Sequence, residues 1–199
     1  MSFILDEDKA LKTWLAGITV SDAKNAERPV GVWFGQPDLE IRDQSFPYLT
    51  IDLINIAVDP SRRHSGILEE TIVTINEDEE EVTQTFEFEY PIPVSIMYQI
   101  SSYSRNPRHD RQIINQVLND RLKMMYGFLY VEEDNTARRL DLLNFVKRDV
   151  VEDSKRLFIN NFSVMVTSEV PVSTMRELLA VTDVNIDTQL LITQNTIPG

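Results

Sequence analysis

The sequence contains no cysteine, which excludes disulfide bonds and every metal site built on thiolates. Its two histidines, His64 and His109, have no second ligand at the spacing of a zinc motif. Glycine occurs only six times in 199 residues, and no glycine-rich phosphate-binding pattern is present. The nucleophile motif of the serine hydrolases is also missing. We therefore expect no metal, no cofactor and no enzymatic activity.

Long apolar runs and basic charge are scarce as well. No apolar stretch approaches the roughly 20 residues that a membrane span needs, and the first residues do not have the pattern of a signal peptide. Acidic residues outnumber basic ones by 32 to 19, so that the net charge is −13. Such a chain repels phosphate backbones. We expect a protein made in the cytoplasm, with no membrane contact and no direct binding of nucleic acid.

The most informative stretch runs from Glu89 to Gly127. Its first half alternates apolar and more polar residues, which predicts a strand with one buried face. The apolar positions of this face are Ile92, Val94, Ile96, Tyr98 and Ile100. Apolar residues then recur at helical spacing, with Asn106 suited to the N-cap, Pro107 to the first helical position and Gly127 to a left-handed stop. The pattern predicts a long strand and then a helix of about five turns that covers the sheet.

Several other segments also have strand or helix patterns. Residues 48–58 predict a strand whose apolar face switches after Leu53, which indicates a bulge or burial of both faces. Residues 156–170 predict a long strand. Residues 138–151 fit a strand or a helix, with a strand favoured around 142–146. Helices are expected from Phe3 to about Gly17 and over residues 174–180.

Two alternating segments surround the most charged run of the chain. Residues 67–75 and 82–90 each predict a strand, and the run Asn-Glu-Asp-Glu-Glu-Glu lies between them. Two strands joined by such a turn form a β-hairpin. Because burying its carboxylates would be costly, we expect the tip of this hairpin to protrude into solvent.

Together these patterns predict an α+β fold. It is mainly an antiparallel sheet covered by one central helix, with a protruding acidic β-hairpin at 67–90 and an extended C-terminal arm. We expect one domain over residues 1–183 and the arm over 184–199. The arm is too polar for a core helix but contains Leu190, Leu191 and Ile192. It either adds to the sheet edge of a neighbouring subunit or packs along its own subunit.

A basic cluster marks the corner before the central helix and its first turn. Its members are Arg105, Arg108, His109 and Arg111. Cations near a helix N-terminus oppose the helix dipole, and Asp110 compensates only part of this charge. Two interpretations remain open, since the cluster can face an anionic partner surface or pair with carboxylates of its own chain.

The strand and its corner resemble the tail terminator and neck proteins of long-tailed bacteriophages. The residues that carry the resemblance are Pro91, Pro93, Tyr98, Gln99, Ile100, Ser104, Arg105, Asn106 and Pro107. The resemblance implies a structural virion protein that forms a ring, commonly hexameric, which caps the tail and joins it to the head connector. Its partners would be copies of itself and other tail and neck proteins. A baseplate or tail-tube assembly protein, or an unrecognised hydrolase, is the alternative.

Overall fold

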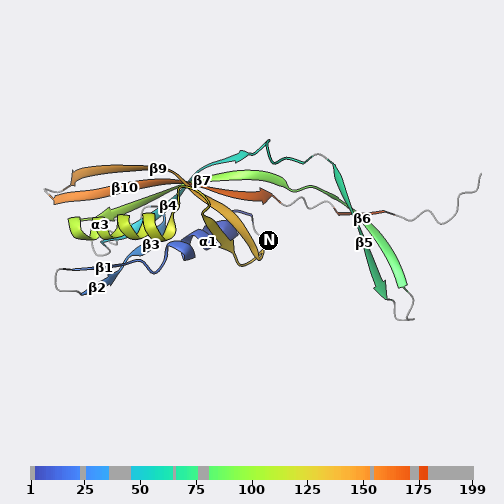
Figure 1. The fold of residues 1–199 in the computed structure, drawn as a ribbon, viewed down its shortest axis with the longest axis horizontal. Helices are drawn as coiled ribbons and strands as arrows, with labels where there is room; N and C mark the ends of the chain where they lie inside the picture. The colour runs from blue at the N-terminus through green and yellow to red at the C-terminus, as the bar shows by residue number, and fades with distance from the viewer. Residues whose placement is uncertain are drawn as a thin grey trace, which may run out of the picture. The chain divides into compact units, whose positions relative to one another are not determined.

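The computed structural model describes residues 3–22, 26–35, 46–64, 66–75, 81–152, 155–170 and 175–178. The chain divides into two compact units (Figure 1). Unit 1 consists of Met1–Ser65 and Pro91–Val172, and unit 2 consists of Gly66–Tyr90 and Ser173–Gly199. Each unit is therefore built from two stretches that are distant in the sequence.

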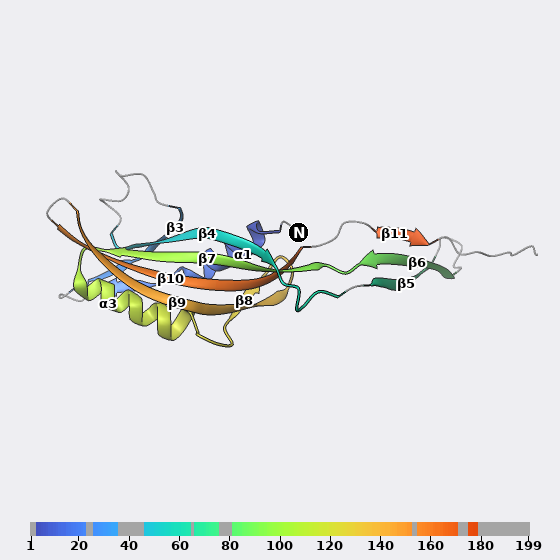
Figure 2. The same ribbon diagram turned by 90° about the horizontal axis from the view of Figure 1, so that it is seen from above.

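Unit 1 is built around a curled six-stranded sheet (Figure 2). Its strands, in spatial order, are β3 (Gly31–Phe34), β4 (Tyr48–Val58), β7 (Ile92–Ser104), β10 (Lys155–Val170), β9 (Thr136–Glu152) and β8 (Phe128–Val131). Neighbouring strands are antiparallel, except that β3 runs parallel to β4. A separate two-stranded ladder joins β1 (Thr19–Ser21) to β2 (Glu27–Pro29).

The core of unit 1 lies between the sheet and two short helices. The expected alternation of β7 is confirmed from Val94 to Ile100, where apolar residues are buried and the residues between them are half-buried. It is wrong at the start of the strand, because Ile92 is 39% exposed. Helix α1 (Leu5–Leu15) and helix α3 (Pro107–Gln116) both contribute residues to this core. The fully buried residues of these helices are Leu11, Leu15 and Ile113. Each helix turns its apolar stripe toward the apolar face of the sheet.

The expected fold class is wrong. Among the described residues β-strands predominate, and no single central helix covers the sheet, because two short helices share its inner face. The sheet is mixed, since β3 pairs parallel with β4 while its other neighbouring strands are antiparallel. The prediction failed for two reasons. Helix α1 packs on the sheet as α3 does, so α3 is not the single covering helix. Residues 136–152 also form one long strand rather than the short one expected.

The helix after β7 is also shorter than predicted. Asn106 caps it as expected, with its side chain accepting a hydrogen bond from the Arg108 N–H at 2.9 Å. The α-helix gives way to a π-helical turn, Val117–Arg121, and the helical backbone ends there. Gly127 is not its stop residue. It is needed where the backbone approaches β9, because a Cβ at Gly127 would lie 2.0 Å from the carbonyl oxygen of Leu140.

Two smaller predictions have opposite outcomes. The bulge in β4 is confirmed, because the register with β7 shifts between Leu53 and Asn55. The helix expected over residues 174–180 is wrong, because Met175–Leu178 form strand β11. Strand β11 pairs antiparallel with β6 (Glu81–Glu89), a partner almost ninety residues away in sequence, and a local pattern does not contain that information.

Unit 2 is a three-stranded sheet in the order β11, β6, β5 (Ile67–Ile75). Strands β5 and β6 pair antiparallel in one register from Ile67 with Glu89 to Ile75 with Glu81, as a hairpin requires. Residues 76–80 of the charged run lie outside the described residues, as do Leu190, Leu191 and Ile192 of the predicted arm. None of the side chains described in unit 2 is buried. Apolar residues such as Ile67 and Val73 are more than half exposed.

Candidate interaction site

Helix α3 is fixed to unit 1 by polar contacts on two sides. On one side Gln112 and Gln116 hydrogen bond to the backbone of β1, where Gln112 Oε1 accepts the N–H of Ser21 at 2.8 Å. On the same side His109 Nε2 donates to Asp22 Oδ1 at 2.6 Å. Asp22 also forms an ion pair with Arg28, in which Arg28 Nε lies 3.3 Å from Asp22 Oδ2. His109 is 6% exposed and therefore helps to hold the helix on unit 1 rather than facing solvent.

On the other side of α3, Asp110 enters a buried polar network. Its Oδ1 accepts a hydrogen bond from Asn160 Nδ2 at 2.6 Å, and its Oδ2 pairs with the ammonium of Lys147. The Asn160 amide also donates to Ser102 Oγ at 2.9 Å. This network connects α3 to β7, β9 and β10. Nothing local in the sequence indicates it, because each partner comes from a different element.

The remaining members of the basic cluster differ in their surroundings. The Arg105 guanidinium lies over the Phe46 ring, 4.7 Å from its centroid. Arg108 and Arg111 are exposed, and within the described part of the chain neither forms an ion pair. They line a broad, shallow hollow with Pro107, Gln112 and Asn115. The structure therefore brings Arg108 and Arg111 together on one surface and turns His109 away from it.

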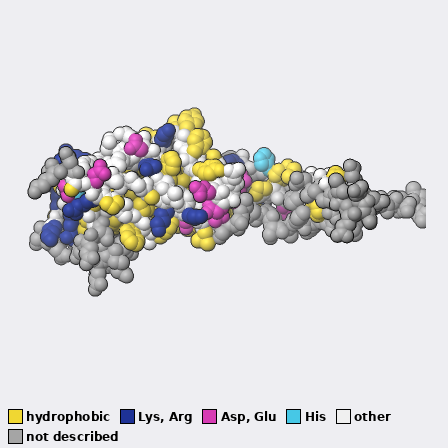
Figure 3. Space-filling view, turned by 90° about the horizontal axis from the view of Figure 1, so that it is seen from below, with side chains coloured by type: hydrophobic (Ala, Val, Ile, Leu, Met, Phe, Trp, Pro, Cys, Tyr) yellow, Lys and Arg dark blue, Asp and Glu magenta, His cyan; other side chains and the backbone are white. Residues whose placement is uncertain are grey.

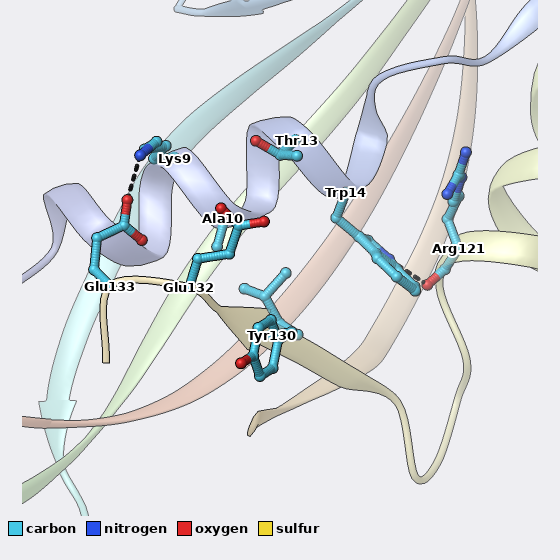
Figure 4. Close-up of a pocket in the computed structure, with 9 residues that line it drawn as sticks. Lys9, Ala10, Thr13, Trp14, Arg121, Tyr130, Glu132 and Glu133 are labelled. Carbon is cyan, nitrogen blue, oxygen red and sulfur yellow. Dashed lines mark hydrogen bonds and ion pairs between the residues drawn. The ribbon is translucent and has the colours of Figure 1, made fainter. Parts of the chain in front are cut away.

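A small cavity of about 180 Å³ lies between α1 and β8 (Figure 4). On one side of it Lys9 pairs with Glu133, and this hydrogen bond lowers the pKa of the Glu133 carboxyl. On the other side the Trp14 indole N–H donates to the Arg121 carbonyl oxygen at 2.9 Å. A carboxylate held in its charged form by a cation is a poor general acid.

Exposed apolar residues occur along the stretch from Met124 to Tyr130, and Tyr130 also lines this cavity. Met124, Met125 and Tyr126 lie shortly after the helical segment, which ends at Arg121, and are each more than two thirds exposed. Phe128 and Tyr130 on the edge strand β8 are also more than half exposed. Exposed methionine and aromatic side chains in one stretch are typical of a surface that contacts another protein.

Two carboxylates at the start of α1 face the core. Glu7 is 2% exposed and accepts hydrogen bonds from the Ser168 hydroxyl and, at 2.9 Å, from the Ile4 N–H. Asp8 accepts the Tyr98 hydroxyl at 2.7 Å. Burial raises the pKa of Asp8, and it also raises the pKa of Tyr98. Both groups are committed to internal contacts, so they do not form an open catalytic pair.

The burial of Asp8 predicts how the stability of the protein depends on pH. A carboxyl whose pKa is raised in the folded state binds its proton more tightly there than in the unfolded chain. Its contribution to stability therefore falls as pH rises from the unfolded value of 3.8 through the higher folded value. We expect the native protein to lose stability relative to Asp8→Asn over this interval. Urea denaturation of both proteins from pH 3.5 to pH 7 measures the difference, and a difference that does not change with pH would contradict the burial of Asp8.

Metal and membrane sites are not found in the described residues. No group of three or more potential metal-ligating side chains converges there. Neither described helix is long enough or apolar enough to cross a bilayer.

No family model matches the sequence, and no curated protein matches it. Comparison with solved structures finds several similar chains, among them a terminator of a contractile injection system. The particular structure is the sheath/tube terminator of the extracellular contractile injection system PVC, determined by cryo-EM in the extended state. The sequence identity is 13% and the TM-score is 0.47. The match covers 98% of this chain and 66% of the other, so this chain spans just under two thirds of that protein.

Proposed function

We propose that this chain is a structural subunit of a phage-type tail, located at the tail terminator or the neck. The observation that carries the proposal is unit 2. Its three-stranded sheet has no buried side chain among those described, and apolar residues on β5 face solvent. A sheet of this size needs a hydrophobic face that is covered in order to be stable. A second molecule that packs on this sheet would bury its apolar side chains, which the described part of an isolated chain leaves exposed.

Two further observations support an assembly role. The strand and corner from Pro91 to Pro107 resemble those of phage tail terminator and neck proteins, and the structure realises this stretch as β7 followed by the capped start of α3. The exposed apolar stretch at residues 124–130 adds a second surface suited to protein contact. Exposed apolar side chains on both units are typical of a protein whose neighbours cover part of its surface.

The finer parts of the proposal concern assembly and location. Copies of the chain form a closed ring, hexameric as the resemblance implies, that caps the tail and contacts the head connector. Partners are other copies and other tail and neck proteins, assembled in the host cytoplasm and retained in the virion. Residues 184–199, with Leu190, Leu191 and Ile192, act as an arm that docks on a neighbouring subunit. The basic cluster of Arg105, Arg108, His109 and Arg111 lies at or behind a subunit contact.

The ring can be tested on the purified full-length chain. Contacts between two different surfaces of identical subunits close into rings when the rotation closes. We expect light scattering at high protein concentration to give the mass of a closed oligomer, and negative-stain images to show rings of sixfold symmetry or of a threefold or twelvefold relative. Open filaments, or a monomer at every concentration, would contradict the proposal. A baseplate or tail-tube role predicts rings that bind tube or baseplate proteins instead of the connector.

A further inference from the structure

We infer that, in the ring proposed above, the acidic hairpin of one copy docks on the basic face of α3 in the next copy. The acidic hairpin is the segment of residues 66–90. The basic face is the exposed side of α3 formed by Pro107, Arg108, Arg111, Gln112 and Asn115. The inference rests on the proposed function and specifies the pair of surfaces that closes the ring.

The basic face has a positive charge that the described part of its own unit does not neutralise. The one acidic residue in the first turn of α3, Asp110, points inward and is committed to Lys147 and Asn160. Asp22, which follows β1 directly, is committed to His109 and Arg28. Figure 3 shows Lys and Arg side chains gathered at the left end of unit 1, the end at which α3 begins in Figures 1 and 2.

The position of these arginines opposes the stability of their own helix. Arg108 and Arg111 lie in the first turns of α3, where the helix dipole is positive and where anions are favoured. The sequence contains 32 acidic residues, yet the exposed side of this helix start has none. An anionic group from outside the subunit would offset both the arginine charges and the dipole.

The acidic hairpin has the opposite imbalance. Residues 66–90 contain no Lys or Arg, and their carboxylates are Glu69, Glu70, Glu77, Asp78, Glu79, Glu80, Glu81, Glu87 and Glu89. The register of β5 with β6 places Glu69 directly opposite Glu87, and like charges in this position destabilise a strand pair. Arg176 of β11 stands opposite Glu87 in the register with β6, but the hairpin has no cation of its own to offset its other carboxylates.

Each surface therefore supplies the charge that the other needs. The basic face is shallow and open, which suits a segment that reaches it from another molecule. The face is also rigid, because Gln112, Gln116, His109 and Asp110 fix α3 on both sides. Because the two surfaces are different, each copy uses its hairpin on one neighbour and its basic face on the other, as a ring requires.

The absence of cysteine makes a direct test possible. Two full-length variants are prepared, Asn115→Cys on the basic face and Glu79→Cys in the acidic hairpin, and they are mixed with a short thiol cross-linker. A cross-linked heterodimer can only join two copies, since each has one thiol. We expect it to form at least about tenfold faster than either homodimer, and to disappear at high salt. Asn144→Cys, an exposed position on β9, serves as the matched control.

Charge reversal then tests the contact itself. Arg108→Glu with Arg111→Glu in the first variant should abolish the heterodimer, and Glu77→Arg with Glu80→Arg in the second should restore it. The reversed helix should keep its melting temperature or gain slightly, because glutamate is favoured at a helix N-terminus. Lys123→Glu with Lys155→Glu makes the same change in net charge at exposed sites and should have no effect.

The outcomes separate this inference from the proposed function. Suppose that light scattering shows rings but the pairing of Asn115→Cys with Glu79→Cys is not favoured, or that the charge reversals show no rescue. Either result overturns the hairpin contact and leaves the assembly role standing. A melting temperature that falls on reversal also overturns it, since the arginines would then act within their own subunit. If the native chain forms no oligomers at any concentration and the two variants form no cross-links, both the contact and the ring are wrong.

Discussion

Replacing Asp110 with alanine is expected to lower the free energy of unfolding by about 3 kcal/mol. The Asp110 carboxylate is 3% exposed and accepts hydrogen bonds from Asn160 and from the ammonium of Lys147. Its removal leaves part of the buried Asn160 amide without a partner, and an unsatisfied buried polar group costs about 1–3 kcal/mol. Loss of the ion pair adds less than a fully buried pair would, because the Lys147 side chain is 39% exposed.

Urea denaturation measures this effect through the shift of the midpoint at constant slope. Asp120→Ala is the matched control, since Asp120 is exposed on the π-helical turn that follows the same helix. Its expected effect is within about 0.5 kcal/mol. Equal effects of the two substitutions would show that the buried network does not hold α3 on the sheet.

Gly127→Ala is expected to destabilise unit 1 by about 3 kcal/mol or more, at the upper end of overpacking effects. The added methyl group would lie 2.0 Å from the Leu140 carbonyl oxygen and 3.2 Å from its carbon, and these are backbone atoms that cannot rotate away. The hydrogen bond in which Gly127 O accepts the Leu140 N–H at 2.9 Å would break. Strand β8 begins at the next residue, so its pairing with β9 would be lost or shifted.

Gly35→Ala provides the control for the loss of glycine alone. Gly35 has a φ of +65°, and a Cβ built on it meets no atom within 4 Å. The expected cost there is only the left-handed backbone penalty, about 1 kcal/mol. Hydrogen exchange of the β8 and β9 amides should show loss of protection in Gly127→Ala and none in Gly35→Ala. Normal protection of β8 in Gly127→Ala would contradict the close approach.

Elements defined by local patterns were predictable. The alternation of β7, the cap at Asn106 and the bulge after Leu53 depend on residues a few positions apart, and the sequence contains each of these signals in full. Strand pairing between β5 and β6 is local in the same sense. Each of these predictions depends on local backbone conformation or on one buried face. None of them requires knowledge of partners that are distant in the sequence.

Features that depend on distant partners were not predictable. Residues 175–178 form a strand because β6 offers an edge, although their own pattern fits a short helix. Gly127 has the sequence context of a helix stop, but its role is set by the approach of Leu140. His109 lies in a basic cluster, and its burial depends on Asp22 from a segment almost ninety residues earlier. Only one part of the candidate interface was predictable from the sequence. Arg108 and Arg111 are three residues apart on one helix, so local helical spacing places them on one exposed surface.

The pairing of β11 with β6 has a consequence for the order in which the protein is made. During synthesis the β5–β6 hairpin leaves the ribosome long before residues 175–178, because all of β7, α3, β8, β9 and β10 come between them. Until then the outer edge of β6 has no strand beside it, and an open edge is a site at which chains pair wrongly. Only a chain that extends past residue 178 can close that edge. Nascent or truncated chains are therefore the forms in which this protein is most exposed to aggregation.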